Sequence, residues 1–256
     1  YKKAININPS NPDIYNKLAA TQLAKGDVKE AVISFNKVIR IDPNDVKAQH
    51  LLAASIGTTP DTAPRKYVEG LFDHYAPSFE ISLVNKLQYT VPQTLAELAF
   101  SNHAKCSLGS ILDLGCGTGL MGAKLRQSCK RLEGIDLSHK MLNQAQRKKI
   151  YDKLTHVDIL EHLKSTELNF DYYFAADVFI YVGDLSELFY LIKKHNKSSG
   201  KLLFSTENSE KDGFFLEKYG RYAHSKSYIQ KLCDEYDYQL TCFSKVNLRK
   251  EGNEFI

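Results

Sequence analysis

The amino-acid sequence predicts an α/β protein with a doubly wound, mostly parallel sheet that follows a short α-helical segment. Two observations support this prediction. From about residue 109 onward, short apolar runs alternate with amphipathic stretches, which is the pattern of strands joined by helices in a parallel sheet. Before that point, the first sixty residues match themselves at an offset of 34 residues, the length of a stacked helical hairpin.

Residues 1–57 are expected to form helical repeats, because YKKAININP at the start matches FNKVIRIDP 34 residues later. Small Ala19 and Ala31 would let two helices approach closely, and Gly26 would make the turn between them. The complete unit, residues 9–42, resembles a tetratricopeptide repeat, a family whose stacked units bind protein partners on a concave surface. A protein-binding surface and a packing extension of the next domain both remain open. The chain opens in the middle of a repeat, so we expect a truncated N-terminus.

The stretch TTPDTAPRK, residues 58–66, has two prolines among small polar residues and is expected to be a linker. Residues 67–256 would then form the α/β domain. Its strand and helix candidates alternate, and Ser138 is placed to cap a helix. The strand candidates are 110–115, 131–136, 155–160, 170–178 and 200–207, and the first two helix candidates are 118–129 and 138–148.

Three glycines, Gly115, Gly117 and Gly119, directly follow the first strand candidate and would let a ligand approach the backbone closely. Asp136 ends the second strand candidate, 21 residues after Gly115, where an acid can accept hydrogen bonds from both hydroxyls of a ribose. Both features fall at the carboxyl ends of parallel strands, so the sequence predicts a nucleoside site there. The spacing GxGxG and the preceding Asp113 disfavour a dinucleotide, because a pyrophosphate would meet an acid. A ligand that carries an ammonium group would be stabilised by the same acid.

The stretch DLGCGTG, residues 113–119, resembles motif I of the class I S-adenosylmethionine-dependent methyltransferases. The resemblance runs from about Tyr67 to the end of the chain. It implies a Rossmann-like fold with S-adenosylmethionine as the cofactor, and it favours this family over a dehydrogenase. It also implies that the cofactor is contacted by Tyr75, Asp113, Gly115, Cys116, Gly117, Gly119, Asp136, Leu137, Met141, Asp158, Ile159, Ala176 and Asp177.

The resemblance gives these residues separate roles. Asp113 and the backbone of residues 115–117 would hold the methionine part of the cofactor. Asp136 would hold the ribose, Leu137 would pack on the adenine, and Met141 would lie near it.

Further along the chain, Asp158 would accept a hydrogen bond from the adenine amino group, or it is simply a surface acid. The backbone N–H of Ile159 would face the ring, and residues 176–177 would border both the methionine part and the substrate. Upstream, residues 67–105 resemble the N-terminal cap of many small-molecule enzymes of this class. Tyr75 and Phe79 of that segment would pack over the cofactor, or they are core aromatics.

The chemistry that follows from this resemblance is in-line transfer of a methyl group from a sulfonium, which depends mainly on proximity and orientation. A base is needed only if the acceptor is protonated. The candidates at the expected mouth are Tyr181, Glu207, Arg221 and His224. Arg221 and His224 precede a helix candidate capped at Ser225, and either could bind an anionic substrate or move a proton. Alternatively, they pair with local carboxylates or cap chain segments.

Several classes of function are disfavoured. The net charge of +4 is too small for a polyanionic partner, and ADVFIY after the fourth strand candidate lacks the proline motif of enzymes that methylate bases, so nucleic acid is an unexpected partner. No apolar run reaches the roughly 20 residues of a membrane span. Five cysteines without a CxxC pair indicate reduced thiols in the cytoplasm and no metal site.

Three hypotheses remain open: a methyltransferase for a small molecule, a protein methyltransferase whose repeats recruit the target, and an inactive cofactor-binding scaffold. We favour the first.

At the C-terminus, residues 239–249 have the length and composition of a sixth strand, and residues 254–256 would begin a seventh that inserts beside the fifth. Three residues cannot fill that position. We therefore expect a continued parent chain, and either a stub of the seventh strand or a gap beside the fifth.

Overall fold

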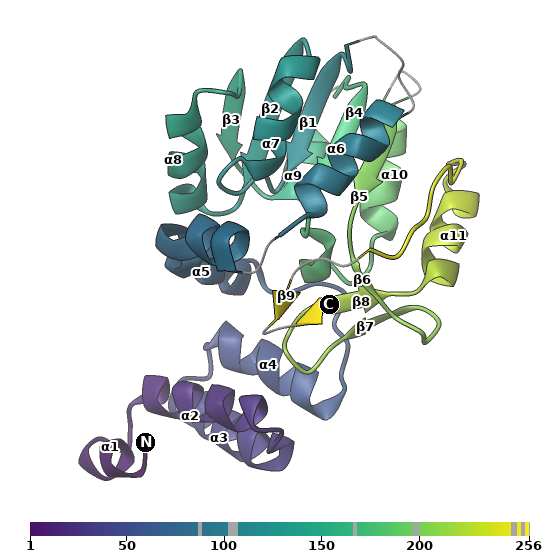
Figure 1. Ribbon diagram of the computed structural model, residues 1–256. Coiled ribbons are helices and arrows are strands. Elements are labelled where there is room, and N and C mark those ends of the chain that lie inside the picture. Colours follow the sequence, from purple (N-terminus) through teal and green to yellow (C-terminus); the bar gives the residue numbers. More distant parts are fainter. Residues whose placement is uncertain are drawn as a thin grey trace.

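A five-stranded parallel sheet forms the centre of the α/β domain. The computed structural model describes residues 1–86, 89–101, 107–165, 168–196, 200–246, 250–251 and 254–255. The strand order is β3-β2-β1-β4-β5 (Figure 1). The predicted α/β fold is therefore confirmed. The strands are β1 (Ser110–Leu114), β2 (Arg131–Asp136), β3 (Lys153–His156), β4 (Tyr172–Ala175) and β5 (Lys201–Phe204).

Alternate residues of β1 serve two separate cores, as the pleat of a strand requires. Ile111 packs in a cluster with residues of the helices on one face, and Leu112 and Leu114 pack in the cluster on the opposite face. The first face is covered by α6 (Val91–Ser101) and α7 (Leu120–Leu125), and the second by α9 (Ile159–Ser165), α10 (Ser186–His195) and α11 (Lys226–Glu235). The helix α8 (His139–Lys148) follows β2 and is capped by Ser138, whose Oγ accepts from Met141 N at 3.1 Å.

The chain runs outward from β1 to β3 and then returns to β4 on the other side of β1. This reversal places the carboxyl ends of β1 and β4 side by side, which is where open α/β sheets bind their ligands. The two following loops are in close contact, because a Cβ on Gly115 would lie 2.6 Å from Cγ2 of Val178. The site of interest is thus expected at this edge of the sheet.

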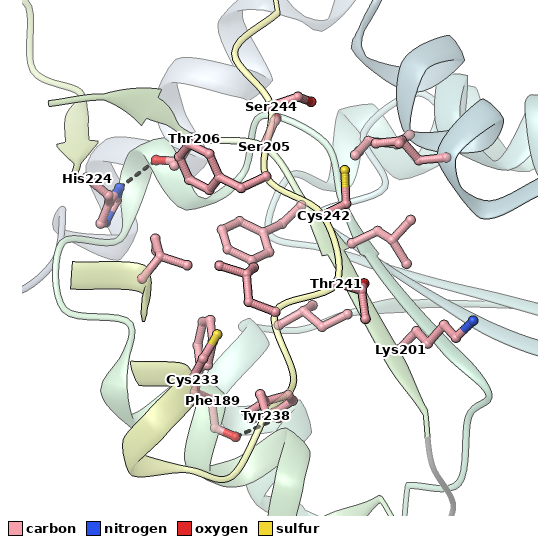
Figure 2. A pocket seen from close by; sticks show the side chains of 18 of the residues that line it. Phe189, Lys201, Ser205, Thr206, His224, Cys233, Tyr238, Thr241, Cys242 and Ser244 are labelled. Atoms are coloured by element: carbon pink, nitrogen blue, oxygen red, sulfur yellow. Dashed lines mark hydrogen bonds between the residues drawn. The ribbon is translucent and has the colours of Figure 1, made fainter. Parts of the chain in front are cut away.

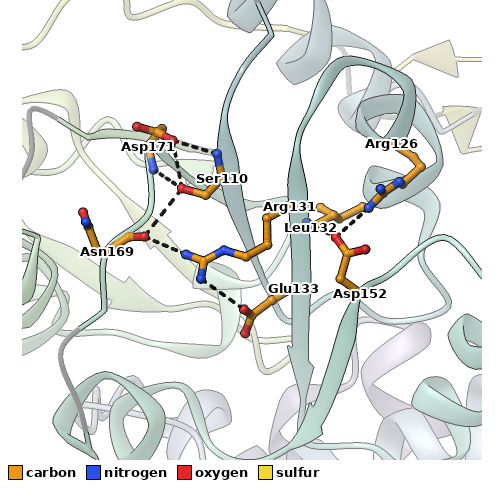
Figure 3. A network of polar contacts seen from close by, with 8 residues as sticks. All are labelled: Ser110, Arg126, Arg131, Leu132, Glu133, Asp152, Asn169 and Asp171. Atoms are coloured by element: carbon orange, nitrogen blue, oxygen red, sulfur yellow. Dashed lines mark hydrogen bonds and ion pairs between the residues drawn. The ribbon is translucent and has the colours of Figure 1, made fainter.

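A polar network joins the opposite, amino ends of the strands (Figure 3). Asp171 accepts hydrogen bonds from both the backbone N and the Oγ of Ser110, at 2.7 and 2.8 Å. Arg131 donates to the Asn169 carbonyl at 2.7 Å and lies 4.5 Å over the Phe170 ring. These contacts fix where the strands begin and lie away from the ligand edge.

The N-terminal helices are α1 (Lys2–Ile7), α2 (Pro12–Ala24), α3 (Val28–Ile41) and α4 (Val46–Ile56). Ala19 and Ala31 are fully buried in the core between these helices. Asn11 and Asp45, which are 34 residues apart, cap α2 and α4 in the same way, each through a side-chain oxygen that accepts from a backbone N–H. The helical repeat that the sequence predicts is therefore present.

The segment expected to be a linker packs closely onto the loop after β4. The Asp61 carbonyl accepts from the backbone N–H groups of Gly183 and Asp184 at 2.9 and 2.8 Å. Ala63 is buried and donates its N–H to the Tyr181 carbonyl at 3.2 Å. Residues 58–66 are thus part of the contact between the repeats and the α/β domain.

The segment expected to be a cap contains α5 (Arg65–Tyr75), the short 3-10 turn η1 (Ala76–Ser78) and the π-helix η2 (Ile81–Lys86) before α6. Polar contacts attach it to α8. Ser138 Oγ donates to Asp73 at 2.6 Å, and Lys148 forms an ion pair with Glu80 at 2.6 Å. The cap therefore covers the carboxyl end of β2.

After β5 the chain forms a small sheet of β6 (Glu207–Asn208), β7 (Phe214–Leu216) and β8 (Tyr222–His224), and then α11. The prediction of a strand over residues 239–249 is wrong for residues 239–246, which are not in a strand; residues 247–249 lie outside the described part. All side chains of residues 241–246 are exposed, so none of them provides the half-buried face that stabilises a strand.

Residues 254–255 do not lie beside β5. They form β10 (Glu254–Phe255), which pairs with β9 (Lys250–Glu251) in a separate two-stranded sheet. Within the described residues nothing pairs with the outer edge of β5, in agreement with the predicted gap beside that strand.

Candidate active site

A cavity of about 760 Å³ lies at the carboxyl ends of β1, β2 and β4, beneath the cap. Most of its lining is apolar and aromatic, which is usual for a small-molecule site. Many residues predicted from the sequence come together in its wall. These are Tyr75, Gly115, Gly117, Asp136, Leu137, Met141, Asp158, Ile159, Ala176, Asp177, Tyr181 and Arg221.

The glycine loop has a conformation that other residues rarely adopt. Gly115 and Gly117 have φ angles of 63° and 55°, in the left-handed region. Nothing lies within 4 Å of the position that a Cβ on Gly117 would occupy, so the cavity reaches the backbone there. The Gly117 N–H donates to Oδ2 of Asp136 at 2.8 Å, and this bond fixes the loop to the end of β2.

Asp136 is also held by its other oxygen, because Oδ1 accepts from the Ser138 N–H at 2.7 Å. Burial raises the pKa of Asp136 to about 6, against the effect of these two hydrogen bonds. A carboxylate has about four acceptor positions, so two remain for donors in the cavity. The residue therefore fits its predicted role as the acceptor for two ribose hydroxyls.

Three of the residues predicted to contact the cofactor do not line the cavity. Asp113 is 1% exposed and accepts a hydrogen bond from the Tyr151 hydroxyl at 2.6 Å. Burial raises the pKa of Asp113 to about 7. Cys116 is buried and donates its N–H to the Ile135 carbonyl, and Gly119 stands at the N-terminus of α7. In this structure all three support the glycine loop from behind.

Residues that follow β2 and β3 form the part of the cavity wall that continues from Asp136. Asp158 caps α9, since its Oδ1 accepts from the N–H groups of Leu160 and Glu161 at 2.8 and 3.2 Å. Its Oδ2 accepts no hydrogen bond from the described residues. Leu137 and Met141 add apolar surface next to it. The arrangement suits a flat, partly polar ring such as adenine.

Aromatic side chains from the cap cross the cavity toward the loop after β4. Tyr75 and Phe79 lie edge to face at 5.5 Å, Phe72 contacts Phe79 at 6.3 Å, and Phe72 contacts Tyr181 at 5.3 Å. All four line the cavity. They give the cavity an aromatic wall between the cap and the loop after β4.

The four candidate bases are placed differently from one another. Tyr181 lines the cavity, but burial raises the pKa of its hydroxyl well above the usual range, so it stays protonated. His224 is 2% exposed, and both ring nitrogens are occupied: Nδ1 contacts the Thr206 hydroxyl at 2.5 Å and Nε2 contacts the Gly183 carbonyl at 2.9 Å. Burial also lowers the pKa of His224. The structure does not bring His224 to the cavity under the cap.

Glu207 and His224 instead line a second cavity, of about 890 Å³, between β5 and residues 238–246. Figure 2 shows the Thr206–His224 contact at one end of this cavity and Phe189 with Tyr238 at the other. Arg221 lines both cavities and forms an ion pair with Glu207 at 2.6 Å. Arg221 is therefore the candidate that connects the two.

Comparison with known proteins agrees with this geometry. Residues 112–204 match the family model described as "Methyltransferase domain". The chain contains a methyltransferase domain. Its cofactor is S-adenosylmethionine, and the open backbone at Gly117 and the spare acceptor positions of Asp136 fit that group. Residues 1–26 match the model of a tetratricopeptide (TPR) repeat.

The methyltransferase domain is 31% identical over 145 residues to a malonyl-[acyl-carrier protein] O-methyltransferase of Hamiltonella defensa, covering 53% of this chain and 56% of that protein. It is 33% identical over 115 residues to human methyltransferase-like protein 27, with coverage of 44% and 45%. The chain thus spans about half the length of the curated relatives it matches. A solved complex of DhpI with S-adenosylhomocysteine (SAH) shares the fold, with a TM-score of 0.50 and 16% identity over 67% of this chain and 86% of that one.

Several cavity residues were not predicted from the sequence. The segment 58–66 contributes Thr62, Ala63 and Arg65 to the lining. The start of α5 contributes Tyr67, and the loop before β8 contributes Tyr219. The sequence marks the first group only as a proline-containing stretch of small polar residues, a pattern that does not show whether the stretch packs on a domain. No local signal marks Tyr219.

None of the helices in the described ranges is long and apolar enough to cross a bilayer. In the same ranges, His, Cys, Asp and Glu residues form no group of three or more that could hold a metal ion.

Proposed function

We propose that this protein transfers a methyl group from S-adenosylmethionine to a small-molecule acceptor that binds beneath the cap. The proposal rests on one observation, a single cavity whose two ends differ in their lining residues. The first end has the glycine loop with Asp136 and Asp158, and the second has Tyr67, Tyr181 and Arg221 with little other polarity. The first end suits the cofactor and the second suits an acceptor.

The cofactor supplies an activated methyl group, so the residues of the chain act by binding and orientation. Asp136 would fix the ribose and thereby the position of the reacting centre. The aromatic residues Phe72, Tyr75 and Phe79 would exclude water from it. Of the four candidate bases, Tyr181 stays protonated, Arg221 is paired with Glu207, and neither Glu207 nor His224 lines this cavity. This set fits an acceptor that is already deprotonated at neutral pH.

Two further features support a small acceptor. Residues of the segment 58–66, including Thr62 and Ala63, line the cavity, and Thr62 forms a β-bridge to Val182 across it from the loop after β4. The relative from Hamiltonella defensa is named for methylating a malonyl group on a carrier protein, which is an acyl acceptor of small size. The repeats would then be a docking surface for a protein partner, such as one that delivers the acceptor.

The experiment is calorimetric titration with SAH and with NAD, followed by transfer of labelled methyl groups into separated small-molecule and protein fractions. We expect binding of SAH, no binding of NAD, and label in the small-molecule fraction. Label confined to the protein fraction would instead assign a protein acceptor. Absence of SAH binding by the folded chain would refute the proposal.

A further inference from the structure

Arg221 occupies an unusual position at the acceptor end of the cavity. Only two residues in the described lining are cationic, Arg65 and Arg221. Arg65 forms an ion pair with Glu161 at 2.9 Å, and its side chain is 44% exposed. The Arg221 side chain is 26% exposed and lies between Tyr67, Tyr181 and Tyr219.

The guanidinium group of Arg221 is held from one side. Its closest approach to Glu207 is made by Nε, at 2.6 Å from Oε1. The second oxygen of Glu207 accepts from the Tyr219 hydroxyl at 2.7 Å, and the guanidinium lies 4.7 Å over the Tyr219 ring. Glu207 is thus ion-paired with Arg221 and hydrogen-bonded to Tyr219, although the geometry at Nε does not make a hydrogen bond, and the Tyr219 ring packs against the guanidinium.

The other edge of the guanidinium has no such partner. No described residue accepts a hydrogen bond from Nη1 or Nη2 of Arg221, although the side chain lines the cavity. Planar, paired N–H donors of this kind match the two oxygens of a carboxylate. A phosphate dianion fits less well, because Glu207 already offsets the charge of Arg221.

We propose that the methyl acceptor carries a carboxylate, which binds to the Nη edge of Arg221 while Glu207 and Tyr219 hold that arginine in position. This inference rests on the proposed function. A carboxylate at this end would also be attracted by the positive sulfonium of the cofactor at the other end of the same, mostly apolar cavity. Tyr67 and Tyr181 add hydroxyl groups whose raised pKa values keep them neutral donors beside the anion.

The test uses the full chain saturated with SAH. Its probes are straight-chain monocarboxylic and dicarboxylic acids of two to ten carbons, each paired with the corresponding primary amide, together with inorganic phosphate. Binding is measured by calorimetry. We expect at least one acid to bind about tenfold or more tightly than its amide, and Arg221→Gln to reduce the affinity of that acid to that of the amide. The affinity for SAH should stay unchanged in the variant.

Arg131→Gln is the matched control. Like Arg221, Arg131 forms an ion pair with a glutamate, Glu133, and lies over an aromatic ring, that of Phe170 at 4.5 Å, but it stands at the opposite end of the sheet (Figure 3). The Arg131→Gln protein should still bind the acid more tightly than the amide. If Arg221→Gln does not fold, Tyr219→Phe decides the question, since Tyr219 is 55% exposed and loses only the hydrogen bond to Glu207. We expect that variant to bind the acid several-fold more weakly and the amide equally well.

Four results would overturn the inference. The first three are no acid preferred over its amide, a preference that survives in Arg221→Gln, and unchanged binding of the acid by Tyr219→Phe. The fourth is tighter binding of phosphate than of any acid. Each of these is observed on protein that binds SAH, so it leaves the proposed function standing. Loss of SAH binding by the wild-type chain would instead remove the proposed function itself.

Discussion

Asp136 gives the sharpest test of the cofactor site. Its two oxygens already accept from Gly117 and Ser138, at 2.8 and 2.7 Å, and two ribose hydroxyls would complete its acceptor positions. Net contributions of hydrogen bonds to charged groups are about 1.5–3 kcal/mol each. Asp136→Ala removes both ribose contacts and also releases the glycine loop. We expect the affinity for SAH to fall by about 2 kcal/mol or more, which is roughly 30-fold.

The pH dependence makes this test specific. Burial raises the pKa of Asp136 to about 6 in the free protein, and ribose donors favour the ionised form, so the pKa is lower in the complex. The affinity for SAH should therefore be constant above about pH 6 and decrease as pH falls below that value. In Asp136→Ala this part of the pH dependence should disappear.

The assay is calorimetric titration with SAH between pH 5 and 8. The matched control is Asp152→Asn, since Asp152 also accepts from a backbone N–H, that of Leu132 at 2.7 Å, but at the amino end of β2. The control should bind SAH as the wild type does. Equal affinity of wild type and Asp136→Ala, or a pH profile that the variant retains, would show that Asp136 does not hold the ribose.

Three further predictions concern support for the site. Burial raises the pKa of Asp113 to about 7, far above that of an unfolded aspartate, so the folded chain binds more protons than the unfolded chain between about pH 4 and 7. The free energy of unfolding should therefore fall as pH rises through that range. Asp113→Asn should raise the melting temperature at pH 8, and an unchanged melting temperature would contradict a buried, ionised carboxylate. Gly115 has a φ of 63°, and the Cβ of an alanine there would lie 2.6 Å from Val178, so Gly115→Ala should abolish SAH binding. A Cβ on Gly70 would meet nothing within 4 Å, so the Gly70→Ala protein should bind SAH normally. Residues 58–66 should resist a broad protease until the chain unfolds, because Asp61 and Ala63 bond to the loop after β4; rapid cleavage there in native protein would mean that these contacts are not stable in solution.

The edge of the sheet where Gly115, Gly117 and Asp136 meet could be predicted from the sequence because its signals are local. The glycines directly follow one strand candidate, and the acid stands at the end of the next. The parallel arrangement then brings them to one edge without further information. The limits of the strands were less accurate, since β3 ends at His156 and the strand candidate ran on to residue 160.

The position of Asp113 could have been inferred more fully. Leu112 and Leu114 are its neighbours in β1, and both pack on the face that α10 covers. The pleat must therefore turn Asp113 to the other face with Ile111, toward α7 and Tyr151. The motif shows that an acid stands there, but the alternation of the strand shows where its side chain points.

The acceptor end could not be predicted, because it is assembled from parts that are far apart in the chain. Thr62 and Tyr67 precede β1 by more than forty residues, and Tyr219 and Arg221 follow β5. The last repeat helix brings these parts together: His50 is buried, contacts the Gly220 carbonyl at 2.9 Å and lies 4.7 Å from the ring of Tyr67. Gly220 stands between the two cavity residues Tyr219 and Arg221, so α4 supports both sides of the acceptor end at once. Within the described residues, no hydrogen bond joins residues 1–57 to the glycine loop. A change in α4 is therefore expected to alter binding of the acceptor before it alters binding of the cofactor, and this would make the repeat segment a part of the proposed acceptor site.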